Sequence, residues 1–344
     1  MKLNYQKVCQ DLLKELSQRT KDIIEQRFGL KTGERKTLEA IGKNYGICRE
    51  RVRQIEADGF LRLKPKLEKY QGVFQNFSNQ IHGFGDLKKE EILLNSLGSP
   101  RFQNQTFFLL TLGDQFERFS ENRDFYSLWT INPDSLVFAK SVLNLLYNKL
   151  AEINQPQNFE EIFKKIDSNL GEPLTPRVLQ SFLEVSKKIQ SGIDGQFGLK
   201  DWPEINPRGV KDRVYLIFKK ENRPLHFTEA TRLINSSKSK KISQPPALVQ
   251  TVHNELIKDS RFVLVGRGLY ALREWGYVPG VVKDVISMIL REEKRPLTKE
   301  EIIEKVLKQR VIKVNTVLIN LNHFPRTPNG KYKYRGRGEQ PILG

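Results

Sequence analysis

The stretch TLEAIGKNYGICRERVRQIEA, residues 37–57, carries two helical patterns separated by a glycine. Thr37 is a suitable N-cap for the first helix, and Glu39 places negative charge in the first turn of that helix. Gly46 can adopt the positive φ that a tight turn requires, and a longer helix is expected to begin near Cys48. A helix, a tight turn and a second helix together make a helix-turn-helix.

The second of these helices is predicted to have one polar face. At about 100° per residue, Val52 and Ile55 fall on one side of the helix and four polar residues fall on the other. Arginine can bind a guanine edge with two hydrogen bonds, glutamine can bind adenine, and glutamate can accept a hydrogen bond from cytosine. A solvated charged face is the commoner meaning of such a helix, but the preceding helix and turn favour base reading. The four polar residues are Arg49, Glu50, Arg53 and Gln54.

The residues before this motif also predict helices. Between residues 8 and 28, apolar side chains recur at helical spacings, with a break at which Ser17 could cap a second helix. Gly29 is expected to end that helix. The apolar positions are Leu12, Leu13, Leu16, Ile23, Ile24 and Phe28.

Residues 16–64 resemble region 4 of the sigma-70 family of bacterial RNA polymerase initiation factors, because the segments RFGL, TLEAIG and RERVRQIEA match in order and spacing. The resemblance implies that the four polar residues read the promoter −35 element in the major groove. It also implies RNA polymerase as a partner, through the flap of the β-subunit. The positions at which the family touches DNA phosphates are occupied by Arg19, Arg27 and Thr37, with Arg51 as a further candidate.

The segment departs from the family pattern at two places. Cys48 stands where the family often has a threonine or serine cap. Asp58 and Gly59 replace a usual Lys-Ala, so the end of the second helix is expected to be weak. Elsewhere, nothing resembles the aromatic-rich segment with which sigma factors melt the −10 element, so initiation by this chain alone is not expected.

Three tryptophans, Trp129, Trp202 and Trp275, are spaced 73 residues apart, which indicates an internal repeat. Each ends an aromatic stretch in which two short apolar runs flank polar residues or glycine, the pattern of a β-hairpin. A fourth version lacks the tryptophan but keeps Tyr332 and Tyr334. We expect the aromatic residues to pack in cores rather than stack on bases.

Residues 207–277 and 278–336 each read as three helices followed by a hairpin, the plan of a winged helix. In the second of these units, Thr298 and Glu301 form a capping-box signature. Both units resemble the HARE-HTH domain, which also occurs in the delta subunit of bacterial RNA polymerase and in chromatin and restriction proteins. The resemblance rests on RPLHFTEATRLI, on a Thr-Val helix and on GRGLYALREW.

The sequence therefore predicts a mainly α-helical chain with a helix-turn-helix and tandem winged-helix modules that carry small β-hairpin wings. The expected parts are the helix-turn-helix (1–70), a linker (71–85), two degenerate winged-helix-like modules (86–130 and 131–206), two HARE-HTH-like winged helices (207–277 and 278–336) and a basic tail (337–344).

The charge of the chain favours a polyanionic partner. Its 344 residues include 58 Lys and Arg against 40 Asp and Glu, a net charge of +18. We therefore expect double-stranded DNA as a partner. Basic residues of the later units that are expected to touch the DNA backbone are Lys238, Lys240 and Lys241, with Arg267, Lys331 and Lys333 as further DNA-facing candidates.

Other classes of protein are not favoured. Cys9, Cys48 and the four histidines show no metal-ligand spacing, and the densest apolar stretch, residues 106–112, is too short to span a bilayer. Without a signal-peptide pattern, a cytoplasmic protein associated with the bacterial nucleoid is expected. Phosphate-loop, His-Glu-x-x-His and Gly-x-Ser-x-Gly motifs are absent, and Pro133-Asp134 reads as a helix start rather than as part of a nuclease site. We expect no enzyme, cofactor, metal or small-molecule substrate.

The leading hypothesis is a sequence-specific DNA-binding transcription factor of bacterial type that acts with RNA polymerase. A second hypothesis is an RNA polymerase accessory subunit, similar to delta, that modulates initiation without selecting promoters. A third is a nuclease-associated specificity module, which the absence of a metal-binding carboxylate cluster disfavours.

Overall fold

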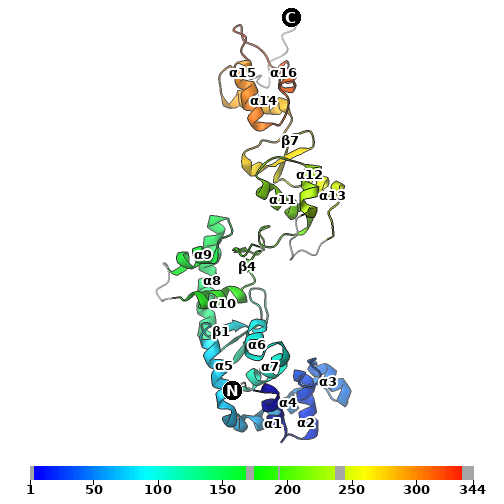
Figure 1. Ribbon diagram of the computed structural model, residues 1–344, viewed down its shortest axis with the longest axis vertical. Coiled ribbons are helices and arrows are strands. Elements are labelled where there is room, and N and C mark those ends of the chain that lie inside the picture. The colour runs from blue at the N-terminus through cyan, green and yellow to red at the C-terminus, as the bar shows by residue number, and fades with distance from the viewer. Residues whose placement is uncertain (1–3, 168–173, 193, 237–244, 335–344) are drawn as a thin grey trace. The chain divides into compact units, whose positions relative to one another are not determined.

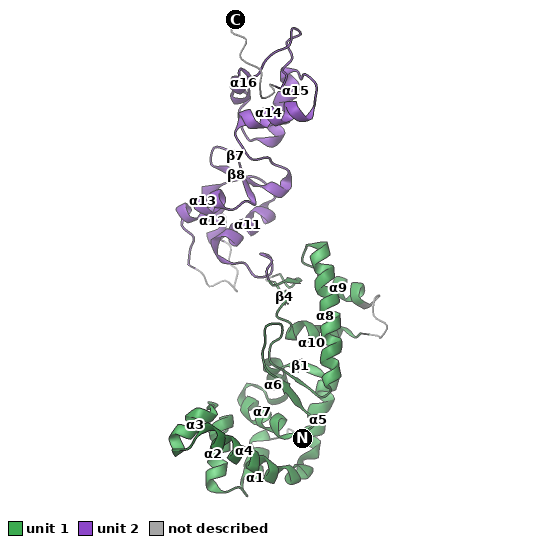
Figure 2. Cartoon of the chain, turned by 180° about the vertical axis from the view of Figure 1, so that it is seen from behind, with its two compact units in different colours: residues 1–200 green, residues 201–344 purple. Residues whose placement is uncertain are grey.

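The computed structural model shows a mainly helical chain with small antiparallel sheets (Figure 1). Two compact units make up the chain, residues 1–200 and 201–344 (Figure 2). The basic residues Lys238, Lys240 and Lys241, and the predicted basic tail, lie outside the described residues. The structure describes residues 4–167, 174–192, 194–236 and 245–334.

The first four helices form the helix-turn-helix module, and their boundaries follow from the caps. Ser17 and Thr37 cap α2 and α3 through their side chains, as predicted. Gly29 and Gly46 end the same helices with φ of 63° and 66°, a conformation that costs glycine little. The helices are α1 (Tyr5–Leu13), α2 (Gln18–Phe28), α3 (Leu38–Tyr45) and α4 (Arg49–Leu63).

The weak helix end expected around Asp58 and Gly59 is not observed, because α4 continues to Leu63. Gly59 is buried where α4 crosses α2. A Cβ atom at this position would lie 2.8 Å from Ile24 Cδ1 and 2.9 Å from Thr20 Cγ2. The glycine therefore lets the two helices approach closely, and this packing compensates for its poor helix propensity.

Residues 71–85 are not a linker, so that prediction was wrong. They contain helix α5 (Gln71–His82), which follows the 3-10 helix η1 (Lys64–Tyr70). Apolar residues recur along α5 at helical spacing and are buried, which is why the segment folds onto its neighbours. The buried residues of α5 are Val73, Phe74, Phe77 and Ile81.

Helix α5 opens the first winged module, which therefore begins near residue 71 rather than at residue 86. Its strand order is β1-β3-β2, all antiparallel, with Leu87 opposite Thr130. The β2–β3 hairpin is the wing. After α5 the module contains β1 (Leu87–Lys89), α6 (Glu90–Gly98), the 3-10 helix η2 (Pro100–Phe102), α7 (Gln103–Leu112), β2 (Glu117–Phe119) and β3 (Leu128–Thr130).

The second winged module, residues 133–199, follows the same order. Helix α8 begins at Pro133, as predicted, and Asn132 caps it. A single bridge between Gln157 and Phe197 replaces the first strand. The elements are α8 (Pro133–Ile153), α9 (Phe159–Asp167), α10 (Pro176–Val185), β4 (Ile189–Ser191) and β5 (Phe197–Leu199).

The third module, residues 209–275, has the strand order β6-β8-β7, which is the topology of the first. Its elements are α11 (Gly209–Glu221), β6 (Leu225–His226), α12 (Phe227–Ser236), α13 (Val249–Lys258), β7 (Phe262–Gly266), β8 (Leu269–Leu272) and the 3-10 helix η3 (Arg273–Trp275).

The fourth module, residues 282–334, repeats the order with bridges in place of full strands. Tyr332 pairs with both Leu297 and Arg326. The predicted capping box of Thr298 and Glu301 is present at the start of α15. The helices are α14 (Val282–Glu292), α15 (Lys299–Gln309) and α16 (Val314–Leu321).

The tryptophans mark the repeat less regularly than their spacing suggests. Trp129 lies inside β3 and is 2% exposed, whereas Trp202 and Trp275 lie three residues after the ends of β5 and β8. The equal spacing therefore joins positions that are not equivalent in the fold. Trp275 is half-buried and packs 6.4 Å from the Phe218 ring, in agreement with a role in the core.

The helix-turn-helix and the first winged module share one large core. Helices α1 and α2 contribute to the same buried cluster as α5, α6 and α7. Phe28 on α2 packs 5.2 Å from Phe108 on α7, and Phe60 on α4 packs 6.1 Å from Phe108. A smaller cluster of Ile23, Ile41 and Val52 holds the turn motif itself together.

Candidate nucleic-acid interface

Helix α4 is held by one apolar side. Val52 is fully buried against Ile23 and Ile41, and Ile55 is half-buried beside them. Because the helix has 3.6 residues per turn, this contact directs the opposite side of its first two turns toward solvent. Cys48 stands at the N-cap without a side-chain hydrogen bond and is exposed.

The four predicted base-reading residues lie on this outward side, and all four are exposed. Arg53 donates a hydrogen bond of 2.7 Å from Nη2 to Oε1 of Glu50 and is 58% exposed. This hydrogen bond lowers the pKa of Glu50 and raises the pKa of Arg53. Arg51 Nη1 donates to Oε1 of Gln54 at 3.1 Å. The structure therefore brings together the residues expected to act as a group.

The residues expected to touch phosphates are placed unequally. Thr37 uses its hydroxyl to accept from the Ala40 amide at 3.1 Å, the bond of an N-cap. Arg19 and Arg51 are exposed. Arg27 is half-buried, and its Nη1 donates to the Lys36 carbonyl at 3.1 Å.

The environment of Arg27 resembles that of a structural arginine. Its Nε lies 3.7 Å from Oε1 of Glu56 on α4, and burial raises the pKa of Glu56. Arg27 thus links α2, the loop before α3 and α4. Its sequence position, next to Phe28 in RFGL, does not reveal this inward orientation.

The loop between α2 and α3 is fastened to the first winged module. Asn104 on α7 donates from Nδ2 to the carbonyls of Gly29, at 3.1 Å, and Gly33, at 2.7 Å. Arg35 Nε donates to Asn104 Oδ1 at 2.8 Å, and its guanidinium lies 3.8 Å from the centre of the Phe107 ring. Burial lowers the pKa of Arg35. These contacts fix the orientation of the turn motif on α7, and sequence reasoning missed them because they join residues about 70 positions apart.

A second link fixes α3 against α2. The Tyr45 hydroxyl donates to the carboxylate of Asp22. Burial and this hydrogen bond raise the pKa of Tyr45 to about 12, and the same bond lowers the pKa of Asp22. Arg19 lies 5.6 Å from the centre of the Tyr45 ring.

The excess positive charge is not spread evenly along the chain. Residues 1–70 contain 17 basic and 10 acidic side chains, and residues 201–344 contain 28 basic and 15 acidic. Residues 71–200 contain 13 basic and 15 acidic. Attraction to a polyanion is therefore concentrated in the helix-turn-helix and in the last two modules.

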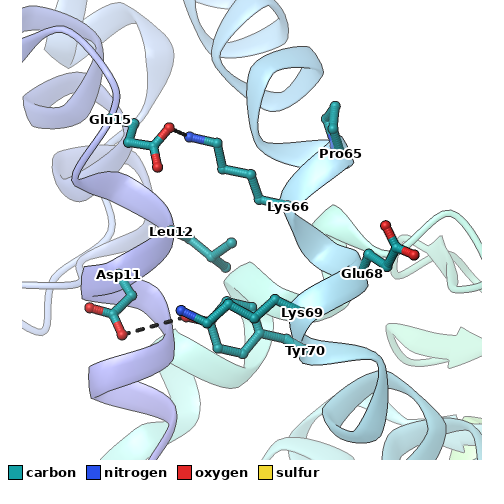
Figure 3. A pocket seen from close by; sticks show the side chains of 8 residues that line it. All are labelled: Asp11, Leu12, Glu15, Pro65, Lys66, Glu68, Lys69 and Tyr70. Atoms are coloured by element: carbon teal, nitrogen blue, oxygen red, sulfur yellow. Dashed lines mark hydrogen bonds and ion pairs between the residues drawn. The ribbon is translucent and has the colours of Figure 1, made fainter.

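A groove between α1 and η1 has mixed charge (Figure 3). Lys66 forms an ion pair with Glu15, and the Tyr70 hydroxyl donates to Asp11 at 3.4 Å. Because its cations face carboxylates, the groove does not favour a polyanion. Its lining residues are Asp11, Leu12, Glu15, Pro65, Lys66, Glu68, Lys69 and Tyr70.

Two further searches concern other kinds of site. Within the described parts of the chain, no group of three or more His, Cys, Asp or Glu side chains is arranged to hold a metal ion. None of the described helices has the length and apolar character needed to cross a membrane.

Comparison with known families confirms the two resemblances. Residues 12–64 match the family described as sigma-70, region 4. Residues 209–275 match the HARE-HTH family, whose description names a helix-turn-helix domain of ASXL and restriction endonuclease proteins. The matched segments coincide with α1–α4 up to Lys64 and with the third winged module.

Curated relatives match the first of these segments. The RNA polymerase principal sigma factor HrdD of Streptomyces viridifaciens is 48% identical over 54 residues, which are 16% of each chain. The RNA polymerase sigma factor SigA of a Bacillus species is 44% identical over 55 residues, or 16% of this chain and 15% of the relative. The RNA polymerase sigma factor sigB of Arabidopsis thaliana is 50% identical over 55 residues, or 16% and 10%. The chain thus spans about a sixth or less of the length of these relatives.

Proposed function

We propose that this chain is a sequence-specific DNA-binding transcription factor of bacterial type, in which α4 reads a promoter −35-type element in the major groove. The observation that carries the proposal is the exposed polar face of α4, which follows a tight turn in a segment that matches sigma-70 region 4. The proposed partners are double-stranded DNA and RNA polymerase, with the β-subunit flap as the docking site. The proposed base-reading residues are Arg49, Glu50, Arg53 and Gln54.

The ion pair on α4 suits a reader that exchanges one partner for another. In the free protein Arg53 and Glu50 satisfy each other at 2.7 Å. In the groove, Arg53 would donate to O6 and N7 of a guanine, and the released Glu50 carboxylate would accept from a cytosine amino group. A sequence without that cytosine would leave Glu50 as a buried unsatisfied carboxylate, and this cost adds discrimination.

The proposal includes no catalytic step, cofactor or metal. It places the protein in the cytoplasm, in association with the nucleoid. Arg19, Thr37 and Arg51 would set the register on the DNA backbone, whereas the inward-facing Arg27 would act by holding α4 in place.

Replacement of Arg53 by alanine tests the proposal. Because a bidentate contact to guanine would be lost, we expect a loss of about 1–3 kcal/mol in binding to the preferred duplex and a relaxed preference at one base position. The measurement is selection from a randomised duplex library, followed by titration of enriched and scrambled duplexes. Arg62→Ala is the matched control, because Arg62 is exposed on the same helix about half a turn away from Arg53. Equal losses on enriched and scrambled duplexes for Arg53→Ala would contradict base reading.

A second candidate function is supported by a specific observation. Helices α13 and α16, the third helices of their modules, expose Ile257 (62%) and Ile319 (66%). Exposed isoleucines suit a protein surface better than a base edge, which favours an accessory subunit of RNA polymerase that does not select promoters. Tight polymerase binding without enrichment of any duplex sequence would favour this candidate over the first.

A further inference from the structure

The four winged modules share one topology but differ in what their third helices contact. In the second module, α10 packs on β1 of the first module. Ser181 Oγ donates to the Leu87 carbonyl at 2.7 Å, and Lys88 Nζ lies 2.5 Å from Oε2 of Glu184. Ser181 and Glu184 lie on one face of α10, one helical turn apart. This face is therefore covered by protein and is not available to a groove of DNA.

The third helix of the first module is covered as well. Helix α7 packs against α1 and α2, and Asn104 and Phe108 contact the helix-turn-helix through the interactions described above. By contrast, the third helices of the last two modules expose polar side chains, namely Gln250 and Asn254 on α13 and Asn315 on α16. The four copies thus fall into a covered pair and an open pair.

The wings divide in the same way. The wing of the first module is bonded to the second module, because the Tyr126 amide donates to the Val185 carbonyl at 3.0 Å and the Lys187 amide donates to the Asp124 carbonyl at 2.9 Å. The first wing, residues 117–128, holds three acidic and two basic side chains, and the second, residues 189–199, holds one acidic side chain and no basic one. Neither wing favours contact with phosphates.

The wings of the third and fourth modules carry only positive charge. Residues 262–272 contain Arg267 and no acidic residue, and residues 324–334 contain three basic residues and no acidic one. Arg267, Lys331 and Lys333 are exposed, and none of them has an ion-pair partner among the described residues. Carboxylates of the same modules are engaged elsewhere, for example Glu229 with Arg223. The wing cations are therefore left without local neutralisation.

The last two modules are joined into one body. Arg310 at the end of α15 is 4% exposed, and its Nη2 donates to the carbonyls of Val278 at 2.7 Å and Gly280 at 2.8 Å in the segment that connects the modules. Gln309 Nε2 donates to the Gly276 carbonyl at 3.1 Å, and the Val311 amide donates to the Val265 carbonyl on β7 at 2.9 Å. The two basic wings are thus held on one framework.

We propose that residues 201–344 form a second, sequence-independent contact with duplex DNA, made by the wing cations Arg267, Lys331 and Lys333 on the phosphates. The first and second winged modules serve as a scaffold that carries the reading helix. This inference rests on the proposed function for the identity of the ligand, but it assigns a separate surface and a different kind of contact.

The test compares the full chain with the triple variant Arg267→Ala/Lys331→Ala/Lys333→Ala. Binding is titrated over a range of salt on a short duplex that just holds the preferred hexamer and on one several helical turns longer. Each lost phosphate contact lowers the slope of log K against log salt by about 0.9. We therefore expect the slope on the long duplex to fall by about 2–3, while the preference for the hexamer remains. Arg123→Ala is the matched control, because Arg123 is an exposed wing cation of the first module.

Two results would overturn the inference. One is an unchanged salt slope in the triple variant, with folding verified by circular dichroism. The other is a loss on single-stranded RNA that exceeds the loss on the duplex. An equal loss in Arg123→Ala would also contradict the division of the modules. Failure of the reading function has a different signature, because Arg53→Ala would then leave base preference unchanged while the triple variant still lowered the slope.

Discussion

Arg27 and Arg53 carry the same charge in the same motif, yet the structure gives them different environments. Arg27 donates to the Lys36 carbonyl and lies beside Glu56, whereas Arg53 is 58% exposed and pairs with Glu50 on the outward side of α4. Helical periodicity predicted the second placement, because Val52 and Ile55 define the buried side. It could not predict the first, since the partners of Arg27 come from a loop and from another helix.

Tyr45→Phe is expected to make the stability of the module less dependent on acid. The variant removes a hydrogen bond to the Asp22 carboxylate and should lower the free energy of unfolding at neutral pH by about 1 kcal/mol. The bond lowers the pKa of Asp22 in the folded state, so its contribution is present above the unfolded pKa and is lost as pH falls through the folded value. Urea unfolding of both proteins between about pH 7 and pH 3 would measure this. A difference that stays constant over the whole range would show that the bond is not the cause.

The same bond has an alkaline limit. Because the pKa of Tyr45 is raised to about 12 in the folded state, its contribution is complete below the unfolded value, which is near 10, and declines as pH rises through the folded value. The wild type is therefore expected to lose stability more steeply than the phenylalanine variant above about pH 10. Parallel unfolding curves for the two proteins on both sides of that pH would contradict this expectation.

At the scale of elements, local signals predicted most helix boundaries of the turn motif, because Ser17, Thr37 and Gly46 act within a few residues of their own position. The same kind of signal was present but overlooked in α5, where buried apolar residues recur at helical spacing. The close crossing of α2 and α4 at Gly59 was beyond local reasoning. Only the fold shows that the glycine is a contact point.

Replacement of two glycines by alanine is expected to have opposite effects on stability. Gly59→Ala would gain about 1 kcal/mol of helix propensity, but its Cβ would lie under 3.0 Å from side chains of α2, and overpacking costs about 1–3 kcal/mol. We expect net destabilisation. Gly72→Ala in α5 has open space around its Cβ and should stabilise by roughly 0.5–1 kcal/mol.

Urea denaturation of the two glycine variants beside the wild type gives both values. Stabilisation by Gly59→Ala would show that α2 and α4 can separate at little cost. Destabilisation by Gly72→Ala would mean that α5 is not the regular helix that its bounds indicate.

At the scale of the whole molecule, the sequence predicted the helix-turn-helix and a HARE-HTH-like unit, and family comparison confirmed both. It did not predict that the helix-turn-helix shares its core with α7, because that contact joins Phe28 to Phe108, far along the chain. Nor could the charge total of +18 show that residues 71–200 contribute none of the excess. Composition gives a sum, and only the division into modules gives its location.

A fragment of residues 1–70 is expected not to fold cooperatively. Phe28 and Phe60 would lose their contacts with Phe108 of α7, and most of the buried cluster would be exposed to water. Thermal unfolding followed by circular dichroism should show a broad, shallow transition for this fragment and a sharp one for residues 1–200. A sharp transition in the short fragment, close in midpoint to that of the longer one, would show that the smaller cluster around Val52 is sufficient.

The dependence of the helix-turn-helix on α7 has a consequence during synthesis. The helix-turn-helix is complete at Leu63, but α7 ends only at Leu112. At about 5–20 residues per second, a ribosome needs roughly 2–10 s to make the intervening chain. Throughout that interval the apolar sides of α1 and α2 are without their partner and are open to chaperones or to neighbouring nascent chains. The first seconds of the protein's existence are thus the period in which the DNA-reading end is most prone to aggregation.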